Sequence, residues 1–222
     1  MNTQLLVLAK APVAGRVKTR LCPPCTPDEA AALARACLLD TIEAVAATPA
    51  ASRTVVLDRT GWPARTPLPV GGLAVVDQRG DGLDRRLAAA FEDTARPRTA
   101  SILIGMDTPH VTPARLIRAV RLLSDADAVL GPADDGGWWL LGLRDPGHAA
   151  ALIGVPMSRP ETGAVTRTAL RARGLRIATT ETLRDVDTAD DARHVAALAP
   201  RSRFAAAWAS PVHRAALPVG AR

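Results

Sequence analysis

Both lysines of this chain, Lys10 and Lys18, lie in one short segment that directly follows the apolar run at residues 5–9. Every other member of the 28 lysines and arginines is an arginine. An ammonium is a compact charge on a flexible stem, whereas a guanidinium is a rigid fork, so the two are not equivalent at a binding site. The presence of lysine only in this segment indicates that it binds a ligand for which a mobile point charge is better suited than a rigid fork. Phosphate is the ligand we expect, because the loop after the first strand of a parallel sheet commonly wraps phosphates.

The segment has the other parts of a phosphate site. Gly15 allows backbone N–H groups to approach a ligand closely. It is not a Walker P-loop, because Pro12 and Val17 stand where that loop needs glycine. Ordinary surface cations are the alternative interpretation, and the position after a strand favours phosphate. The side chains expected to neutralise phosphate charge are Lys10, Arg16, Lys18 and Arg20.

Carboxylates follow at two further places. Asp107, in Gly-Met-Asp-Thr-Pro at residues 105–109, ends the most apolar run, where it can hold a divalent ion on a nucleotide or cap the next turn. Four more carboxylates crowd residues 185–191 just before a helix, so some of them are expected to be caps. One or two can complete a metal site opposite Asp107, where a divalent cation would relieve their repulsion. Asp185 and Asp187 stay equal candidates, since residues two apart can converge in a turn.

A third motif, Gly-Pro-Ala-Asp-Asp-Gly-Gly-Trp-Trp at residues 131–139, combines acids, two glycines and two tryptophans. Its pattern is typical of a loop held close to a ligand, with an aromatic wall. A plain turn followed by core tryptophans is the alternative. The residues expected to contact substrate are Asp135, Gly136, Gly137 and Trp138.

The elements that must position these residues alternate between short apolar runs and longer helical stretches. This alternation predicts an α/β fold: one domain with a mostly parallel sheet flanked by helices. Strands are expected at about residues 3–9, 54–57, 73–76, 101–106, 128–130, 138–143 and 175–178. Helices are expected at about residues 26–47, 83–94, 112–123, 163–173 and 188–199, and the proline-rich segment 61–72 is expected to be a loop. We place the domain at residues 1–199 and expect a basic, poorly ordered tail over residues 200–222.

Bulk properties narrow the partners. The net charge is +6, but five arginines follow the last acid, Asp191, so residues 1–191 carry only +1. With no tyrosine and two phenylalanines there is little material for base stacking, and we expect no nucleic-acid partner. No apolar run is long enough to span a membrane, and the first one has no signal-peptide flanks, so a cytoplasmic protein without a membrane partner is expected. Cys22 and Cys25 have the spacing of a redox pair or half a zinc site, but their context favours neither.

Four motifs in this order resemble the glycosyltransferase-like relatives of the 2-phospholactate guanylyltransferases, in the nucleotide-diphospho-sugar transferase (GT-A) superfamily. They are Lys-Thr-Arg-Leu at 18–21, Gly-Met-Asp-Thr-Pro at 105–109, Gly-Pro-Ala-Asp-Asp-Gly-Gly at 131–137 and Asp-Val-Asp-Thr at 185–188. The resemblance implies that Asp107 binds Mg²⁺ or Mn²⁺ with Asp187 as second carboxylate, and that Lys18 and Arg20 hold phosphates. It also implies contacts to base, sugar or acceptor from Gln78, Gly80 and Ser158. The chain departs from the family pattern at Asp84, where glycine is usual, and at Met157, where an aromatic residue is usual; both departures bear on the acceptor pocket.

The function expected from these residues is a metal-dependent nucleotidyltransferase. An acceptor phosphate or acid oxygen would attack the α-phosphorus of a nucleoside triphosphate in line, with Lys18 and Asp107 in catalytic roles. The cationic first loop favours a triphosphate donor. A glycosyltransferase that uses a nucleotide sugar on the same fold is the first alternative, and a non-catalytic nucleotide-binding module is the second. The expected partners are a nucleotide donor and a small acceptor.

Overall fold

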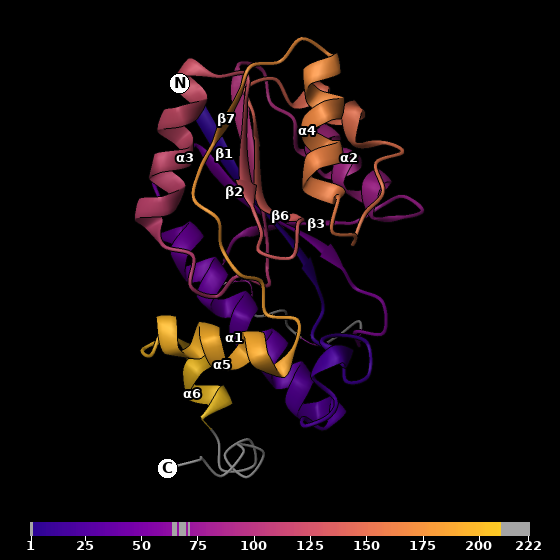
Figure 1. Ribbon diagram of the computed structural model, residues 1–222, viewed down its shortest axis with the longest axis vertical. Helices are drawn as coiled ribbons and strands as arrows, with labels where there is room; N and C mark the ends of the chain where they lie inside the picture. The colour runs from indigo at the N-terminus through magenta and orange to yellow at the C-terminus, as the bar shows by residue number, and fades with distance from the viewer. Residues whose placement is uncertain (1, 64–65, 67–69, 71, 210–222) are drawn as a thin grey trace.

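A computed structural model of the chain describes residues 2–63, 66, 70 and 72–209 (Figure 1). Its centre is one seven-stranded sheet in the order β3-β2-β1-β4-β6-β5-β7. The strands are β1 (Asn2–Lys10), β2 (Ser52–Asp58), β3 (Ala74–Asp77), β4 (Thr99–Gly105), β5 (Ala128–Pro132), β6 (Trp138–Leu143) and β7 (Ile177–Thr179). Only β6 runs against its neighbours, β4 and β5, while the other pairs are parallel. The predicted fold class, a mostly parallel sheet flanked by helices, is confirmed.

The two central strands carry the loops of interest to one edge of the sheet. β1 and β4 are nearly continuous apolar runs, buried on both faces as parallel strands must be. They pair in parallel, with Leu8 opposite Gly105. The segment after Lys10 and the segment after Gly105 therefore leave the sheet side by side, at its carboxyl edge.

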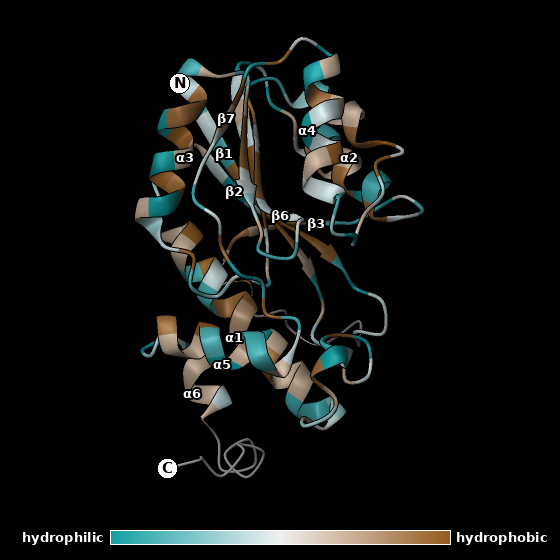
Figure 2. Ribbon diagram, in the orientation of Figure 1, coloured by the Kyte–Doolittle hydropathy of each residue, from teal (hydrophilic) through white to brown (hydrophobic). Residues whose placement is uncertain are grey.

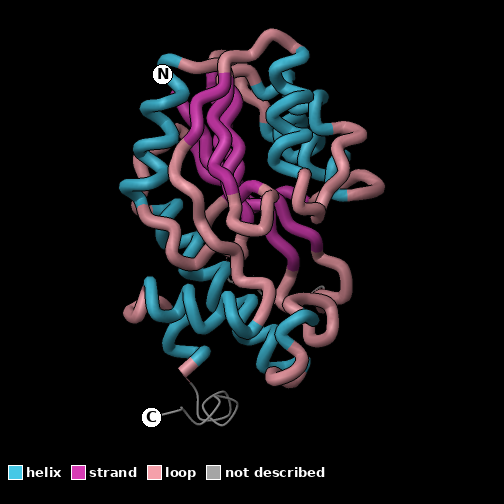
Figure 3. The backbone as a smooth tube through the Cα atoms, viewed as in Figure 1, coloured by secondary structure: helices cyan, strands magenta, loops and turns pink. Residues whose placement is uncertain are grey.

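Helices cover both faces of this sheet, as Figures 1 and 3 show. α1 (Pro27–Ala46) and α3 (Pro113–Asp125) pack on one face, while α2 (Leu83–Thr94), α4 (Thr162–Ala172) and the 3-10 helix η2 (Pro146–Leu152) pack on the other. In Figure 2 these helices alternate between brown, apolar stretches and teal, hydrophilic ones, and their buried apolar residues pack against the strands. The predicted helix starts are confirmed: Thr26 forms a capping box with Glu29, and Thr112 accepts a hydrogen bond from the backbone N–H of Arg115.

A third apolar cluster lies away from the sheet, where α1 meets α5 (Ala189–Leu198) and α6 (Arg203–Trp208). The short 3-10 helix η1 (Thr19–Leu21) contributes Leu21 to it. This cluster anchors the C-terminal end of the first loop, because Leu21, three residues after Lys18, is fully buried in it. No helix among the described residues is long and apolar enough to cross a membrane.

The structure differs from the expected tail at residues 200–209. Ser202 caps α6, and both carboxylate oxygens of Asp40 accept hydrogen bonds from its first backbone N–H groups, those of Arg203 and Phe204. Phe204 is fully buried, so α6 belongs to the domain. The sequence did not predict this helix, because it has few large apolar residues among its alanines and arginines. The rest of the predicted tail, and half of the proline-rich segment 61–72, lie outside the described residues.

Candidate active site

A cleft of about 860 Å³ opens at the carboxyl edge of the sheet, where the loops after β1 and β4 meet the loop before α4. Twelve of the residues predicted from sequence line it, which places the four motifs around one space. These are Lys10, Arg16, Lys18, Arg20, Gln78, Asp107, Asp135, Gly137, Trp138, Ser158, Asp185 and Asp187. Gly15, Gly80 and Gly136 do not line it, and each serves a turn or a close backbone approach instead.

The Lys18 cluster lies in the cleft. The ammonium of Lys18 donates to Asp107 Oδ1 at 2.7 Å, to Asp187 Oδ1 at 3.4 Å and to the carbonyl oxygen of Val186. A backbone hydrogen bond from Val186 N–H to the carbonyl oxygen of Asp107, 2.9 Å long, holds the two carboxylate segments together. The Lys18 side chain is only 4% exposed. We therefore define the Lys18 cluster as Lys18, Asp107, Asp187 and Val186.

Charge in the cluster changes the acidity of its members. Burial alone lowers the pKa of Lys18, but its acidic neighbours, first Asp107 and then Cys37 and Asp187, together outweigh burial and hold that pKa above its usual value. Burial and, after it, the nearby Asp107 carboxylate together raise the pKa of Asp185 to about 7, although a hydrogen bond from Thr108 opposes the rise. That bond joins Thr108 Oγ1 to Asp185 Oδ1 at 2.9 Å. Lys18 is thus a fixed cation, and Asp185 is held by Thr108 beside it.

The other cations of the first loop differ from Lys18. The side chain of Arg20 is 71% exposed and reaches Asp187 Oδ2 at 3.5 Å. Lys10 and Arg16 are exposed and make no ion pair among the described residues. Two cations on this rim are therefore available to an anion in the cleft.

Gln78 is held by the sheet. Its side-chain amide donates to the carbonyl oxygens of Ala9 at 2.8 Å and Val56 at 3.1 Å, which joins the ends of β1, β2 and β3. Its amide N–H groups are used by the fold, so the oxygen is the atom left for a ligand. Gly80 lies in the turn that follows, where its carbonyl accepts from Arg86, and Gly82 lines the cleft in its place.

The loop with the two glycines forms the opposite wall by backbone contact. A Cβ on Gly136 would stand 1.9 Å from the carbonyl oxygen of Pro160, and Gly163 N–H donates to the carbonyl oxygen of Gly136 at 2.8 Å. Asp135 Oδ1 accepts from Gly137 N–H at 2.8 Å. Gly136 thus brings the loop against residues 158–163 and does not itself meet the cleft.

Of the two tryptophans, one lines the cleft, as the ligand-loop interpretation predicts, and the other lies in the core, as the alternative predicts. Trp138 lines the cleft and donates from Nε1 to Thr166 Oγ1 at 3.2 Å. Trp139 is 1% exposed and donates from Nε1 to the carbonyl oxygen of Glu181 at 3.0 Å. Alternation along β6 decides which of them faces the cleft.

Sequence reasoning missed several lining residues, including Leu83, Arg86, Leu87, Arg159 and Thr162. Arg86 pairs with Asp58 at 2.9 Å, so it is a structural cation. Arg159 is exposed and makes no ion pair among the described residues. The family pattern around Ser158 was the signal that could have found Arg159. Asp84, the noted departure, accepts from Gly154 N–H at 2.9 Å and so ties α2 to the segment before Ser158.

The carboxylates fit a hard divalent cation. Asp107 and Asp187 both contact the same ammonium, which shows that this point already holds a positive charge between two carboxylates. Oxygen ligands of this kind suit Mg²⁺ and Mn²⁺, which often take one or two carboxylates and complete their shell with phosphate and water. Within residues 2–209, where described, no group of three or more histidine, cysteine, aspartate or glutamate side chains stands ready for a metal. A metal here would need further ligands from substrate.

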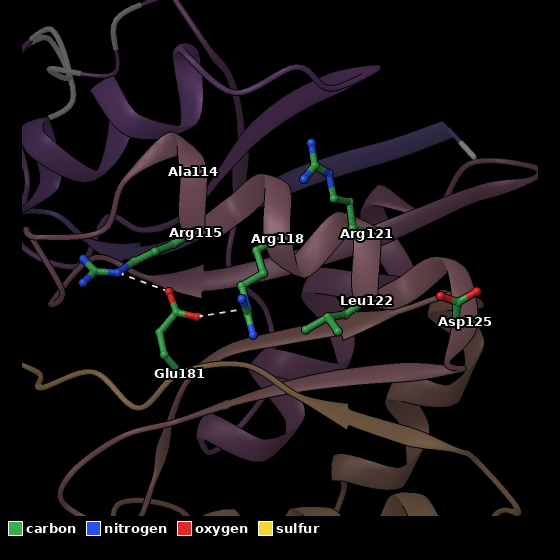
Figure 4. A pocket seen from close by; sticks show the side chains of 7 residues that line it. All are labelled: Ala114, Arg115, Arg118, Arg121, Leu122, Asp125 and Glu181. Atoms are coloured by element: carbon green, nitrogen blue, oxygen red, sulfur yellow. Dashed lines mark ion pairs between the residues drawn. The ribbon is translucent and has the colours of Figure 1, made fainter.

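A second, shallower groove lies on α3, apart from the cleft (Figure 4). Arg115 and Arg118 project from the helix toward Glu181, while Arg121 points away from it. Its oxygens reach Arg115 Nε at 3.2 Å and Arg118 Nε at 3.8 Å. The carboxylates of Glu181 and Asp125 offset two of the three arginine charges, so the lining of the groove carries a net charge of only +1.

Comparison with known proteins places this geometry in a family. A family model described as "Uncharacterized protein conserved in bacteria (DUF2064)" matches residues 41–159. A search of curated proteins finds no match. The fold is shared with a protein from Desulfovibrio desulfuricans G20 provisionally assigned as a nucleotide-diphospho-sugar transferase. The TM-score is 0.77 at 25% identity, over 96% of this chain and 94% of that one.

Two further solved structures share the fold at lower identity. CMP:2-keto-3-deoxy-manno-octonic acid synthetase in complex with CTP matches with TM-score 0.60 and 14% identity, over 90% of this chain and 99% of that chain. Rv0371c from Mycobacterium tuberculosis H37Rv in complex with manganese matches with TM-score 0.53 and 19% identity, over 88% of this chain and 98% of that chain. The fold is that of the nucleotide-diphospho-sugar transferases.

Proposed function

This chain belongs to the bacterial family described as uncharacterized and designated DUF2064, and from that premise we propose that it is a metal-dependent nucleotidyltransferase. The donor would be a nucleoside triphosphate, and the acceptor a small molecule that carries a phosphate or carboxylate. The single observation that carries this proposal is the arrangement of charge in the cleft. Free cations, Lys10 and Arg16, lie on one rim, and two carboxylates suited to a divalent ion lie below them.

The positions of these groups match what nucleotidyl transfer requires. An ionised acceptor oxygen would attack the α-phosphorus, the new O–P bond would form as the bond to the bridging oxygen breaks, and pyrophosphate would leave with that electron pair. No general base is needed, because phosphate and carboxylate oxygens are ionised at neutral pH. Lys10, Arg16 and Arg20 would bind the β- and γ-phosphates, and charge neutralisation with in-line positioning would supply most of the rate.

Asp107 and Asp187 would hold the metal, with Asp185 beside them. The chemistry that a bound Mg²⁺ or Mn²⁺ supplies is neutralisation of charge on the phosphate oxygens. The manganese complex of Rv0371c and the CTP complex of the synthetase, which share this fold, agree with such a site and such a donor. On the other wall, Trp138 would support the base or acceptor, and Arg159 would pair with the acceptor anion.

A glycosyltransferase is the second candidate, because the D. desulfuricans protein is assigned to sugar transfer. Melting-temperature shifts separate the two. We expect each accepted nucleoside triphosphate to raise the Tm in the presence of Mn²⁺ and not in the presence of a chelator, and nucleotide sugars to raise it less. Stabilisation by nucleotide sugars alone would refute the nucleotidyltransferase and favour the alternative. No metal-dependent shift with either class would refute both.

Arg16→Ala tests the phosphate rim. Loss of a charge-assisted hydrogen bond should weaken triphosphate binding by roughly 1.5–3 kcal/mol, which calorimetry measures directly. Because Arg16 is exposed and makes no ion pair among the described residues, the change should leave the fold intact. Arg173→Ala, at an exposed arginine outside the cleft, is the matched control and should bind as the wild type does. Equal affinity of the Arg16 and Arg173 variants would remove this rim from the donor site.

A further inference from the structure

The ammonium of Lys18 has no donor left for a ligand. A lysine ammonium has three N–H donors, and three oxygens surround this one: Asp107 Oδ1, Asp187 Oδ1 and the carbonyl oxygen of Val186. A lysine in a cationic loop is ordinarily expected to face phosphate. Here it faces the protein's own carboxylates instead.

The backbone fixes the lysine in this position. Lys18 adopts a left-handed conformation, with φ 50° and ψ 33°, which few non-glycine residues take. Its neighbour Val17 is buried in the core, and the carbonyl oxygen of Lys18 accepts from Leu21 N–H at 2.9 Å in η1. Lys10, the last residue of β1, does not take a left-handed conformation and stays exposed. The side chain of Lys18 is therefore aimed at the carboxylates by the fold.

The carboxylates in turn require a positive charge. Without the ammonium, Asp107 and Asp187 would face one another beside Asp185, and only Arg20, which reaches Asp187 Oδ2 at 3.5 Å, would remain to offset their repulsion. A divalent ion and the ammonium satisfy the same two carboxylates. They therefore compete for them.

We propose that Lys18 is the internal counter-cation of the metal site, and that it keeps the site closed to metal until a nucleotide binds. Triphosphate oxygens would give the ammonium new acceptors and would give the metal its missing ligands, so metal and nucleotide would enter together. The role of the nucleotide rests on the function proposed above. The competition between Lys18 and metal rests on the Lys18 cluster alone.

Manganese binding without nucleotide tests the competition. Free Mn²⁺ is followed by electron paramagnetic resonance during titration of wild type, Lys18→Met and, as matched control, Arg173→Met, which removes one exposed positive charge outside the cleft. We expect Lys18→Met to bind one Mn²⁺ at least about tenfold more tightly than wild type, the fold-change that one lost charge-assisted hydrogen bond implies. Arg173→Met should bind as wild type does, and adding Asp107→Asn to Lys18→Met should abolish the tight site. Equal Mn²⁺ affinity of Lys18→Met and wild type would overturn the proposal.

Nuclear magnetic resonance of the unmodified protein gives a second test that no folding defect can obscure. With only two lysines, lysine-selective ¹³C labelling yields two ε-methylene signals, and Lys10→Arg assigns them. We expect Mg²⁺ alone to leave the Lys18 signal in place and Mg²⁺ with the four ribonucleoside triphosphates to shift it. A shift of the Lys18 signal by Mg²⁺ alone would overturn the closed site. Tighter Mn²⁺ binding by Lys18→Met without any response to triphosphates would uphold the competition and count against the proposed donor.

Discussion

Lys10 ends β1 and Lys18 lies in the loop that follows it; both carry the same charge, yet Lys18 is buried among carboxylates and Lys10 is exposed. The same division runs through the arginines near the cleft. Arg86 is paired with Asp58, while Arg159 makes no ion pair among the described residues. Paired cations stabilise the fold and have little left to give a ligand, because their donors already have acceptors. Cations without an ion pair among the described residues, such as Lys10 and Arg159, still have N–H donors available to a ligand.

His110 is a buried titratable group outside the cleft, and it should make stability depend on pH. It is 5% exposed, and its Nδ1 has no hydrogen-bond partner in the part of the chain that the structure describes. Burial lowers the pKa of His110 to about 4, with help from Arg115 and His194 against Asp134. The unfolded chain takes up the proton near pH 6.5, and the folded protein only near pH 4. Stability should therefore be intact above pH 6.5 and fall as the pH drops from 6.5 toward 4, by roughly 3 kcal/mol at most.

Urea unfolding of wild type and His110→Gln at pH 7.5 and pH 4.5 measures this loss. The variant should lose less stability on acidification than wild type does, because its side chain takes up no proton. His148→Gln, at a half-buried histidine, controls for removal of any histidine. The same acid sensitivity in wild type and the His110 variant would contradict this prediction.

At the scale of elements, two glycines let the loop before β6 meet the start of α4. Added Cβ atoms would stand 1.9 Å from the carbonyl oxygen of Pro160 at Gly136, and 2.8 Å from the carbonyl oxygen of Gly137 at Gly163. Both obstacles are backbone atoms, which cannot turn aside as a side chain can. The wall of the cleft therefore depends on the absence of side chains at these two positions.

Gly136→Ala should destabilise the protein by more than about 3 kcal/mol, because overpacking adds to backbone strain at φ +87°. Gly154→Ala is the matched control, since Gly154 has φ +85° and open space around its added Cβ. That variant should lose only about 1–2 kcal/mol from backbone strain. Chemical denaturation of both gives the comparison. Similar losses would mean that the contact with Pro160 is not tight.

At the scale of the whole molecule, three separate apolar clusters hold the fold together. Two cover the faces of the sheet, and the third joins α1, α5 and α6 beneath the first loop. Both carboxylate oxygens of Asp40 accept from the start of α6, which brings the end of the described chain back to its first helix. The support of the first loop thus depends on residues far along the chain.

Phe204→Ala should cost about 3–5 kcal/mol of stability, because it leaves a cavity where this fully buried ring of α6 packs against α1 and α5. Leu198→Ala, at the end of α5 where the side chain is 58% exposed, should change stability by less than about 0.5 kcal/mol. Thermal and urea unfolding both report the difference. A Phe204 variant as stable as the Leu198 variant would show that α6 is dispensable for the core.

The sequence by itself determined the elements and the edge at which the site lies. Continuous apolar runs identify buried parallel strands, and threonine–proline pairs identify helix starts, because both signals are local. Because ligands of parallel sheets lie at the carboxyl ends of the strands, the motifs at those ends could be expected to share one edge, although the neighbourhood of β1 and β4 came from the structure. The short helix α6 escaped, because its stability comes from Asp40 and the third cluster and not from its own pattern.

Only the tertiary structure decided what the motif residues contact. Lys18 and Asp187 are 169 positions apart, and nothing in the spacing tells whether the ammonium faces a ligand or a carboxylate of its own chain. Likewise, Gln78 holds the sheet, Gly136 meets Pro160, and Trp138 and Trp139 divide between cleft and core. The physical reason is that hydrogen bonds and ion pairs depend on short distances and defined directions. A small shift of one side chain therefore changes which groups it can bind, and the sequence does not contain those distances.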